Sequence, residues 1–448
     1  MLRLTCLVVA FASFAASTRA ADPPRYRLPV GRVLYYSGEG SSREKDANVP
    51  ASTSKQTWRF TVLAQNPDGS ARLLSRSTNQ YNHQGAAADE DVNTACFDLY
   101  PDGRYRIDPD LAIKTSPERI FPRLPADANQ AAKQWQSDVM WTGNHTTFAP
   151  QPGGAGNEFV FTGVQDGPIN HIYVTTLKAV FYFDPAKGLI ARVTGEHTQD
   201  YGFHSRGTST ITFDKEEHIA ADQAALLDHD YTTFADADNR YRDQVRSLHE
   251  QPDKAKERRD AARAALAADA DKVQTPDVKQ AFEKRLKEID EYAADSVEDA
   301  KRLAARLNKP AANWSAKDLT GQPISLQSLR GKVVVMDFWY RGCGWCMYAM
   351  PQVKQLASDF KDQPVAILGM NTDRDLADAK FVVKELALDY PQVQATGIPE
   401  QFSVQGFPTL IIIDSQGVIR DIHLGYSPDL HEKVSKKIRS LLKPNDQP

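Results

Sequence analysis

The chain has 448 residues, of which 41% are hydrophobic and 25% charged, and its formal net charge is −4 at pH 7. This length exceeds what a single hydrophobic core usually supports, so two or three domains are expected. The near-neutral charge does not indicate a nucleic-acid or membrane-surface binder, and we expect neither as a partner.

The first twenty residues have the three-part layout of a secretory signal peptide. Arg3 supplies positive charge, residues 4–16 form a short apolar run, and small residues follow up to Ala20. A membrane anchor is the alternative, but spanning the ~30 Å hydrocarbon core takes ~20 apolar residues. We therefore expect a signal peptide over residues 1–20, cleaved after Ala20. A periplasmic or otherwise extracytoplasmic protein without a membrane span would remain.

Residues 22–220 alternate between apolar and polar side chains, as β-strands do. Two runs flank a Pro-Asp-Gly turn in TWRFTVLAQNPDGSARLLS, and the segments CFDLYPDGRYRI and AVFYFDPAKGLIARVTG repeat the hairpin pattern. In the first run, Trp58, Phe60 and Val62 fall on one face. Hairpins in series predict an antiparallel, β-rich accessory domain with one buried face.

Three side chains of this region are candidates for chemistry. Cys96 lies in a strand-like segment, where it could be a third redox partner. We favour a buried structural thiol, because free cysteine is among the most buried residue types. His197 and His204 could be metal ligands, but seven positions apart on a β segment is not a recurrent ligand spacing. No metal site is expected.

Residues 221–308 are charged and helical in pattern. Thr275 is expected to cap a helix that begins at Pro276, and Ser296 to cap the next one. The apolar stripe of the first helix consists of Val278, Phe282, Leu286 and Ile289. Residues 253–271 are polar on nearly all sides, which is typical of a solvated spacer helix. A coiled-coil dimer contact is the alternative, but no heptad pattern lasts three or four repeats, so we expect a helical linker.

Residues 309–448 alternate between strands and helices. Buried strands are expected at residues 332–340, 364–371 and 408–414. Helical patterns follow the first two, at residues 347–360 and 375–388. Strands alternating with helices predict a mainly parallel sheet covered on both faces. A hairpin and a terminal helix complete the chain.

Cys343 and Cys346 lie where the first of these strands gives way to its helix. Zinc needs about four ligands, and no second cysteine or histidine pair exists. A structural disulfide across so short a loop has the smallest entropic benefit. A helix N-terminus stabilises a thiolate, so this position favours redox exchange, to which Arg341 could add. Cys343 is then the exposed attacking thiol and Cys346 the buried resolving thiol, with no bound cofactor required.

The run VVVMDFWYRGCGWCMYAMP resembles the thioredoxin fold at several positions at once. Asp337 matches its buried carboxylate, Trp339 the aromatic residue before the first cysteine, and Pro351 the proline that kinks the active-site helix. In GFPT, Pro408 matches the cis-proline that faces the disulfide, and Gly425 matches the glycine after the last strand.

The resemblance covers about residues 311–442 and is to secreted thioredoxin-like proteins of the TlpA/ResA type. It implies an α/β thioredoxin fold and a thiol-disulfide oxidoreductase that reduces specific client disulfides. Asp337 would join the two cysteines as a catalytic proton acceptor. Client proteins and an upstream thiol electron donor are the implied partners. The residues expected to contact the client are Trp339, Arg341, Trp345, Phe407 and Pro408.

The chain also departs from the thioredoxin pattern. Trp345 replaces the proline between the cysteines, Gly342 replaces the preceding tryptophan, and Gly369 stands where thioredoxins have a lysine beside the buried carboxylate. Such changes alter the redox potential, so the direction of electron flow stays open at this point.

Two other functions compete with disulfide reduction. The first is a thiol peroxidase of the peroxiredoxin kind, which uses the same fold. Tyr340 occupies the position of the peroxiredoxin threonine and argues against it. The second is a ligand-binding β domain with a thioredoxin-like docking module, against which the intact cysteines argue.

Overall fold

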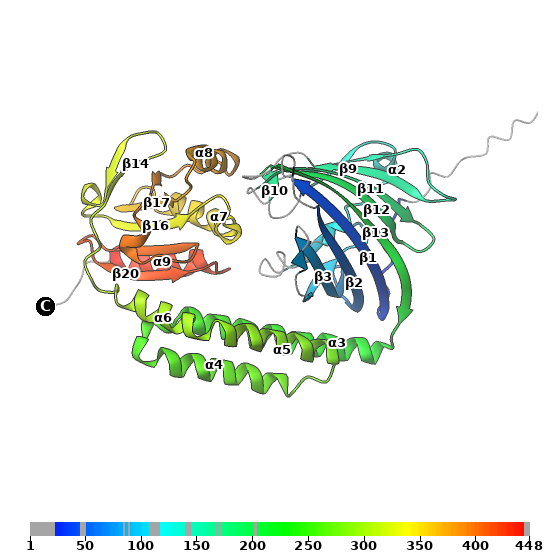
Figure 1. Ribbon diagram of the computed structural model, residues 1–448, viewed down its shortest axis with the longest axis horizontal. Coiled ribbons are helices and arrows are strands. Elements are labelled where there is room, and N and C mark those ends of the chain that lie inside the picture. Colours follow the sequence, from blue (N-terminus) through cyan, green and yellow to red (C-terminus); the bar gives the residue numbers. More distant parts are fainter. Residues whose placement is uncertain are drawn as a thin grey trace, which may run out of the picture.

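The computed structural model describes residues 23–442, except for residues 45–50, 84–85, 88–89, 108–116, 139–144, 166–167, 170–172 and 201–203. The expected signal peptide therefore lies outside the described residues. Figure 1 shows a curved N-terminal β-sheet, a layer of helices and a C-terminal α/β domain, in the order that the sequence predicts. None of the described helices is both long enough and apolar enough to cross a membrane.

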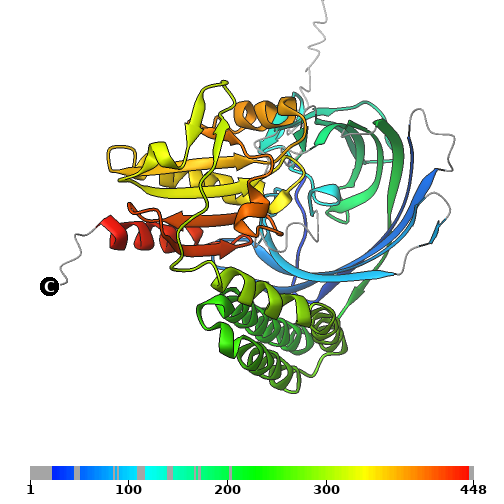
Figure 2. The same cartoon turned by 60° about the vertical axis from the view of Figure 1, so that its left-hand side comes forward.

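The N-terminal part is one large antiparallel sheet. Among the described residues its strands follow the order β6-β5-β3-β2-β1-β13-β12-β11-β9-β8-β7, with β4 beside β3 and β10 beside β11. The strands are β1 (Arg32–Glu44), β2 (Ser52–Gln65), β3 (Ala71–His83), β4 (Ala86–Ala87), β5 (Asp91–Leu99), β6 (Tyr105–Ile107), β7 (Trp135–Asp138), β8 (His145–Pro150), β9 (Phe159–Gln165), β10 (Pro168–Ile169), β11 (Tyr173–Asp184), β12 (Leu189–Asp200) and β13 (His204–His218). Figure 2 shows that the sheet curves strongly, with the helices on its outer side.

The predicted Pro-Asp-Gly hairpins are confirmed. Gly69 turns the chain between β2 and β3, and Gly103 turns it between β5 and β6, each with φ +84°. This left-handed conformation suits glycine because a Cβ would clash there. At Gly103 an added Cβ would also lie 2.3 Å from the carbonyl oxygen of Pro122.

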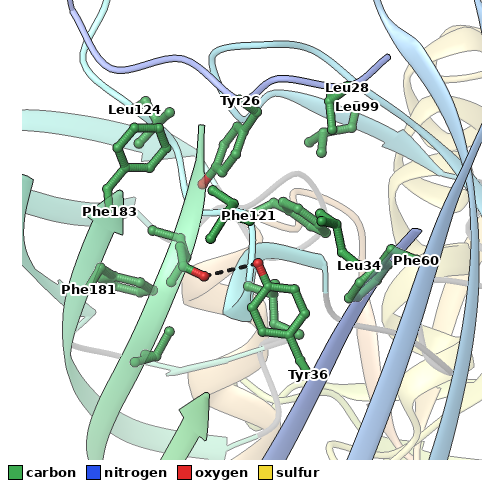
Figure 3. Packing of buried hydrophobic residues seen from close by; sticks show 14 of the residues in the cluster. Tyr26, Leu28, Leu34, Tyr36, Phe60, Leu99, Phe121, Leu124, Phe181 and Phe183 are labelled. Carbon is green, nitrogen blue, oxygen red and sulfur yellow. Dashed lines mark hydrogen bonds between the residues drawn. The ribbon is translucent and has the colours of Figure 1, made fainter. Parts of the chain in front are cut away.

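An aromatic core fills the side of the sheet that faces away from the helices. Phe60 and Val62 are buried in it and Trp58 packs against it, as the alternation along β2 predicts. Phe121 follows the short 3-10 helix η1 (Pro117–Arg119), and its ring centroid lies 4.9 Å from that of Phe60. Figure 3 shows Phe121 among the rings of the opposing strands. This packing anchors η1 on the hollow side of the sheet.

Four helices continue the chain: α3 (Ala221–Arg246), α4 (Ala255–Ala270), α5 (Pro276–Glu291) and α6 (Ala293–Ala304). Helices α3 and α5 cover the outer face of the sheet, where Leu63 and Leu74 pack with Tyr231 and Phe282. The predicted stripe of α5 faces this cluster, with Val278, Phe282 and Ile289 buried and Leu286 partly buried. Thr275 is the N-cap residue before Pro276, as predicted, but its hydroxyl makes no capping hydrogen bond.

Two local predictions for this region are wrong. Helix α4 is not a solvated spacer, because Ala262 and Leu266 are buried against the neighbouring helices. Small alanine side chains let α4 approach α3 closely without a strongly apolar stripe, which hides the buried face in the sequence. Ser296 is not a helix cap. Helix α6 begins at Ala293, and the Ser296 hydroxyl donates to the Ala293 carbonyl.

The C-terminal domain has a five-stranded sheet in the order β18-β17-β16-β19-β20. Strand β17 pairs in parallel with β16 and β18, whereas β19 pairs antiparallel with β16 and β20. The prediction of a mainly parallel sheet is therefore wrong, because the last two strands are joined by a hairpin and the sheet is mixed. A separate two-stranded hairpin, β14-β15, precedes this sheet. The elements are β14 (Ser315–Lys317), β15 (Pro323–Ser325), β16 (Val333–Trp339), α7 (Gly344–Asp359), β17 (Val365–Asn371), α8 (Leu376–Glu385), β18 (Gln392–Gln394), β19 (Thr409–Ile413), β20 (Ile419–Leu424) and α9 (Leu430–Leu442).

Strand β16 is buried along its whole length, with a hydrophobic cluster on each side of the sheet. One cluster joins Val335 and Trp339 to α7 and α9, and the other includes Phe338. Leu303 of α6 belongs to the second cluster, so the last turn of the helical region packs into the C-terminal domain.

Candidate active site

Cys343 and Cys346 lie at the junction of β16 and α7 and form a disulfide. Cys343 is the N-cap residue of α7, and the backbone N–H of Cys346 donates to its Sγ at 3.1 Å. A helix N-terminus carries unpaired N–H groups and a partial positive charge, both of which stabilise a thiolate. Cys343 keeps 6% exposure and Cys346 none. Of the two cysteines of the disulfide, Cys343 is therefore the one that keeps some solvent exposure.

Asp337 lies on the face of β16 that supports α7. Side chains alternate along a strand, so Asp337 shares its face with Val335 and Trp339, which both pack in the cluster that contains the cysteines. The carboxyl group is 1% exposed, and neither oxygen has a hydrogen-bond partner. Burial raises the pKa of Asp337 to about 7. Such a carboxyl can exchange a proton near neutral pH.

Aromatic side chains surround the disulfide. The rings of Trp345 and Tyr426 stack with centroids 5.6 Å apart, and Tyr348 lies 5.8 Å from Trp345. Phe407 packs edge-on against Tyr340 at 5.2 Å, and the Phe407–Pro408 peptide bond is cis. The sequence predictions omitted Tyr348 and Tyr426. Tyr348 could have been found from its position three residues after Trp345, on the same side of a helix.

Comparisons with known proteins identify this part of the chain. A model of the redoxin family matches residues 304–438. The thiol-disulfide oxidoreductase ResA of Halalkalibacterium halodurans is 30% identical over 147 residues, which cover 32% of this chain and 82% of that protein. The chain belongs to the thiol-disulfide oxidoreductases of the redoxin family.

Two further relatives match a similar share of this oxidoreductase. The thioredoxin-like protein YneN of Bacillus subtilis is 30% identical over 129 residues, covering 28% of this chain and 75% of YneN. A solved thioredoxin domain of a thiol-disulfide oxidoreductase from Bacteroides vulgatus is 32% identical. It covers 30% of this chain and 97% of that domain, with a TM-score of 0.28.

Two residues predicted to contact the client are engaged inside the oxidoreductase domain. Trp339 is fully buried, and its indole N–H donates to Oε1 of Gln392 at 3.0 Å, so it offers no surface to a client. This prediction is corrected to a supporting role for Trp339. Arg341 pairs with Asp378 at 2.5 Å and lies 4.4 Å from the ring centroid of Phe381. The Asp378 carboxylate therefore offsets much of the charge that Arg341 could lend to a thiolate.

The departure at Gly369 has a structural explanation. Gly369 pairs with Asp337 on one side and with Gln392 on the other. A Cβ at position 369 would lie 1.9 Å from Oε1 of Gln392. The amide of Gln392 thus occupies the space that a side chain at position 369 would need. The sequence alone gave no reason to select Gln392, because it lies on another strand.

The N-terminal sheet also contributes residues near the redox centre. The hydroxyl of Tyr105 donates to the carboxylate of Glu118 at 3.1 Å. Glu118 lies close enough to Tyr348 that its charge, after burial, raises the pKa of that phenol. The aromatic surface beside Cys343 therefore faces Glu118 of η1 across the boundary between the two parts.

The remaining candidates of the β-rich region lie on three different strands. Cys96 is a free, half-buried thiol between the sheet and the helices, and burial raises its pKa well above the usual range. His197 pairs with Gly207 across β12 and β13, and His204 begins β13. Within the described ranges, no three His, Cys, Asp or Glu side chains are arranged to hold a metal ion.

Proposed function

We propose that this chain is an extracytoplasmic reductase of specific protein disulfides, and that its Cys343–Cys346 pair exchanges electrons with the client. The observation that carries this proposal is the position of Cys343. It caps α7 with limited exposure, while the N–H of Cys346 points at its sulfur. Charge-assisted hydrogen bonds of this kind favour the ionised form of the sulfur.

The first step starts from the enzyme with both cysteines reduced. The Cys343 thiolate attacks one sulfur of the client disulfide, forming a mixed disulfide and breaking the client S–S bond. The second client sulfur leaves as a thiolate and takes a proton. We propose that Trp345 and the backbone of Phe407 hold the client chain beside the sulfur, since both residues pack against the hydrophobic cluster that contains the cysteines. Pro408 is buried directly after Phe407, across a peptide bond that is cis, and would set the direction of the Phe407 backbone toward the client.

The second step releases the client. Cys346 loses its proton to the ionised Asp337 carboxylate and attacks the sulfur of Cys343. The mixed disulfide breaks, the Cys343–Cys346 disulfide forms, and the second client thiolate is released and protonated. The client gains two electrons, which an upstream dithiol donor returns to the enzyme by the same exchange. Asp337 can act here because its pKa of about 7 allows both protonation states.

The location and the role of the sheet belong to the same proposal. The signal-like first twenty residues support export, and Cys343 and Cys346 are suited to a compartment where disulfides persist. We assign the N-terminal sheet to client selection, because Glu118 of η1 faces the aromatic surface beside Cys343. The redoxin-family match at residues 304–438 and the thiol-disulfide oxidoreductase relatives support the reaction class and not the identity of the client.

A trapping experiment tests this function. A Cys346→Ser variant, expressed with its native leader in its native host, is expected to accumulate disulfide-linked complexes that dissociate on reduction. Cys343→Ser should form none, and Cys96→Ser should behave as the parent does. Complexes that persist in Cys343→Ser, or that require Cys96, would contradict the assigned roles.

A further inference from the structure

Helix η1 lies between the redox centre and the hollow side of the N-terminal sheet. Its position is fixed, since Ile120 and Phe121 directly after it are buried in the aromatic core. Glu118 faces Tyr348 of the redox domain. The next residue, Arg119, extends to the sheet, where its guanidinium donates to Oε1 of Gln56 at 3.3 Å and lies 6.0 Å from the ring of Trp58.

Arg119 also lies close enough to the opposite side of the curve to act on a side chain there. Its charge contributes, after burial, to lowering the pKa of His197 on β12. Strands β1 and β13 separate β12 from β2, which carries Gln56. One guanidinium can be near both only because the sheet is strongly curved, as Figure 2 shows.

The hollow side near Arg119 carries buried polar atoms without partners. Phe60 of the core is paired with Ser75, and four residues along, Gln56 is paired with Asn79, so these side chains share one face. On the far side, Phe161 and Gln165 share the corresponding face of β9. Among the described residues, Oγ of Ser75, Oδ1 of Asn79 and Nε2 of Gln165 have no hydrogen-bond partner.

The unpaired polar atoms of Ser75, Asn79 and Gln165 are available to hydrogen-bond a ligand. Ser75 is 1% exposed and Gln165 6% exposed, and buried polar groups in folded proteins are nearly always satisfied. Arg119 has no carboxylate within salt-bridge distance in the described part of the chain, although its guanidinium remains accessible. A cation with free amide and hydroxyl groups beside it fits a carboxylate with adjoining peptide groups.

We propose that the hollow side of the N-terminal sheet, around Arg119, Trp58 and Gln165, binds a segment of the client protein that carries an acidic side chain. This inference rests on the proposed function. The occupant is a client segment and not a free metabolite, because residue 118 of the same short helix faces the redox centre. A chain held at Arg119 passes over η1 and reaches Cys343. The carboxylate pairs with Arg119, its apolar stem lies on Trp58, and its backbone satisfies Gln165 and Asn79.

Two synthetic peptides test the proposal with the full chain. Each contains one intramolecular disulfide followed by an extended segment, with glutamates in one peptide and glutamines in the other. The reduced parent is expected to reduce the glutamate peptide with a KM about tenfold lower, equivalent to ~1.4 kcal/mol of binding. Arg119→Gln should remove this preference, and Arg119→Lys should restore part of it. Equal KM values for both peptides in the parent would overturn the proposal.

Controls separate binding from chemistry and from folding. Arg106→Gln is the matched control, because the Arg106 side chain is 60% exposed and pairs with Asp98. It lies on the face of β6 opposite to that of Tyr105, the residue that contacts Glu118 of η1. It should keep the parent preference, and circular dichroism should match among all variants. Calorimetry of the oxidised parent with the same peptides, their cysteines replaced by serine, measures binding without electron transfer.

The calorimetric result distinguishes the two proposals. Preferential binding of the glutamate peptide without reduction of either disulfide peptide would refute the reductase function and leave the acidic-segment site supported. Reduction of both peptides without any binding preference would refute the site alone. N-acetylglutamate that binds as tightly as the glutamate peptide would show a small-molecule site and overturn the assignment to a client segment.

Discussion

Replacing Asp337 with asparagine should change how the stability of the protein depends on pH. Burial raises the pKa of the folded-state carboxyl to about 7 from an ordinary value of 3.8. The stability associated with the protonated carboxyl is therefore fully present below pH 3.8 and is lost as the pH rises to about 7. Each pKa unit corresponds to about 1.36 kcal/mol, so the full span is roughly 4 kcal/mol. Between pH 5 and pH 9 the parent should lose roughly 3 kcal/mol from this group.

Urea denaturation of the oxidised protein, followed by tryptophan fluorescence, measures this difference. An asparagine at position 337 does not ionise. From pH 5 to pH 9, the free energy of unfolding of the parent should therefore fall by roughly 3 kcal/mol more than that of Asp337→Asn. Asp362→Asn is the matched control, because Asp362 is an exposed carboxylate of the same domain. Parallel pH profiles for the parent and Asp337→Asn would refute the conclusion that burial holds this carboxyl protonated.

Three further outcomes are expected. Asp337→Asn should slow the decay of a Cys343 mixed disulfide at pH 8 by about tenfold or more while sparing its formation, because general-base help of this kind is typically worth 10²–10⁴-fold. Iodoacetamide should alkylate Cys343 of the reduced protein before Cys346, with an apparent pKa below the ~8.5 of a free thiol; preferential labelling of Cys346 would reverse the assigned roles. The fragment 298–448 should fold alone and reduce insulin. It should unfold at a higher temperature than the fragment 310–448, because the shorter fragment lacks Leu303 and its contact with the C-terminal domain. Equal melting temperatures would show that this contact does not stabilise the domain.

The C-terminal site could be predicted because its signals are local in sequence. The strand before Cys343, the helix after it and the proline of GFPT lie at fixed spacings, and the alternation along β16 places Asp337 toward α7. What could not be predicted depends on long-range packing. Gln392 lies beside Gly369 only because β18 pairs with β17 in that register. The buried face of α4 depends on how closely its alanines approach α3.

The residues that meet on the hollow side of the N-terminal sheet could not be predicted from the sequence for a different reason. Alternation along β2 predicts that Gln56 shares a face with Phe60, but it says nothing of the strands that curl round to oppose them. His197 was considered only as a metal ligand, whereas the structure places Arg119 near it. Arg119 lies in no helix or strand of predictable pattern. The position of Arg119 depends on the burial of Phe121 two residues later. The sequence pattern does not predict that burial.

Gly369, which stands where thioredoxins have a lysine, and its neighbour Gln392 also bear on the pKa of Asp337. A positive charge beside Asp337 would stabilise the carboxylate and lower its pKa. Here the neighbouring strand offers Gly369, and the amide of Gln392 is occupied by the indole N–H of Trp339 and by the carbonyl of Tyr390. Burial is the one cause that raises the pKa of Asp337. Because burial alone raises this pKa, any change that admits water beneath α7 should lower it. Client binding over Trp345 and Tyr426 would further exclude water from this side and raise the pKa of Asp337, which makes its carboxylate a stronger acceptor for the proton of Cys346.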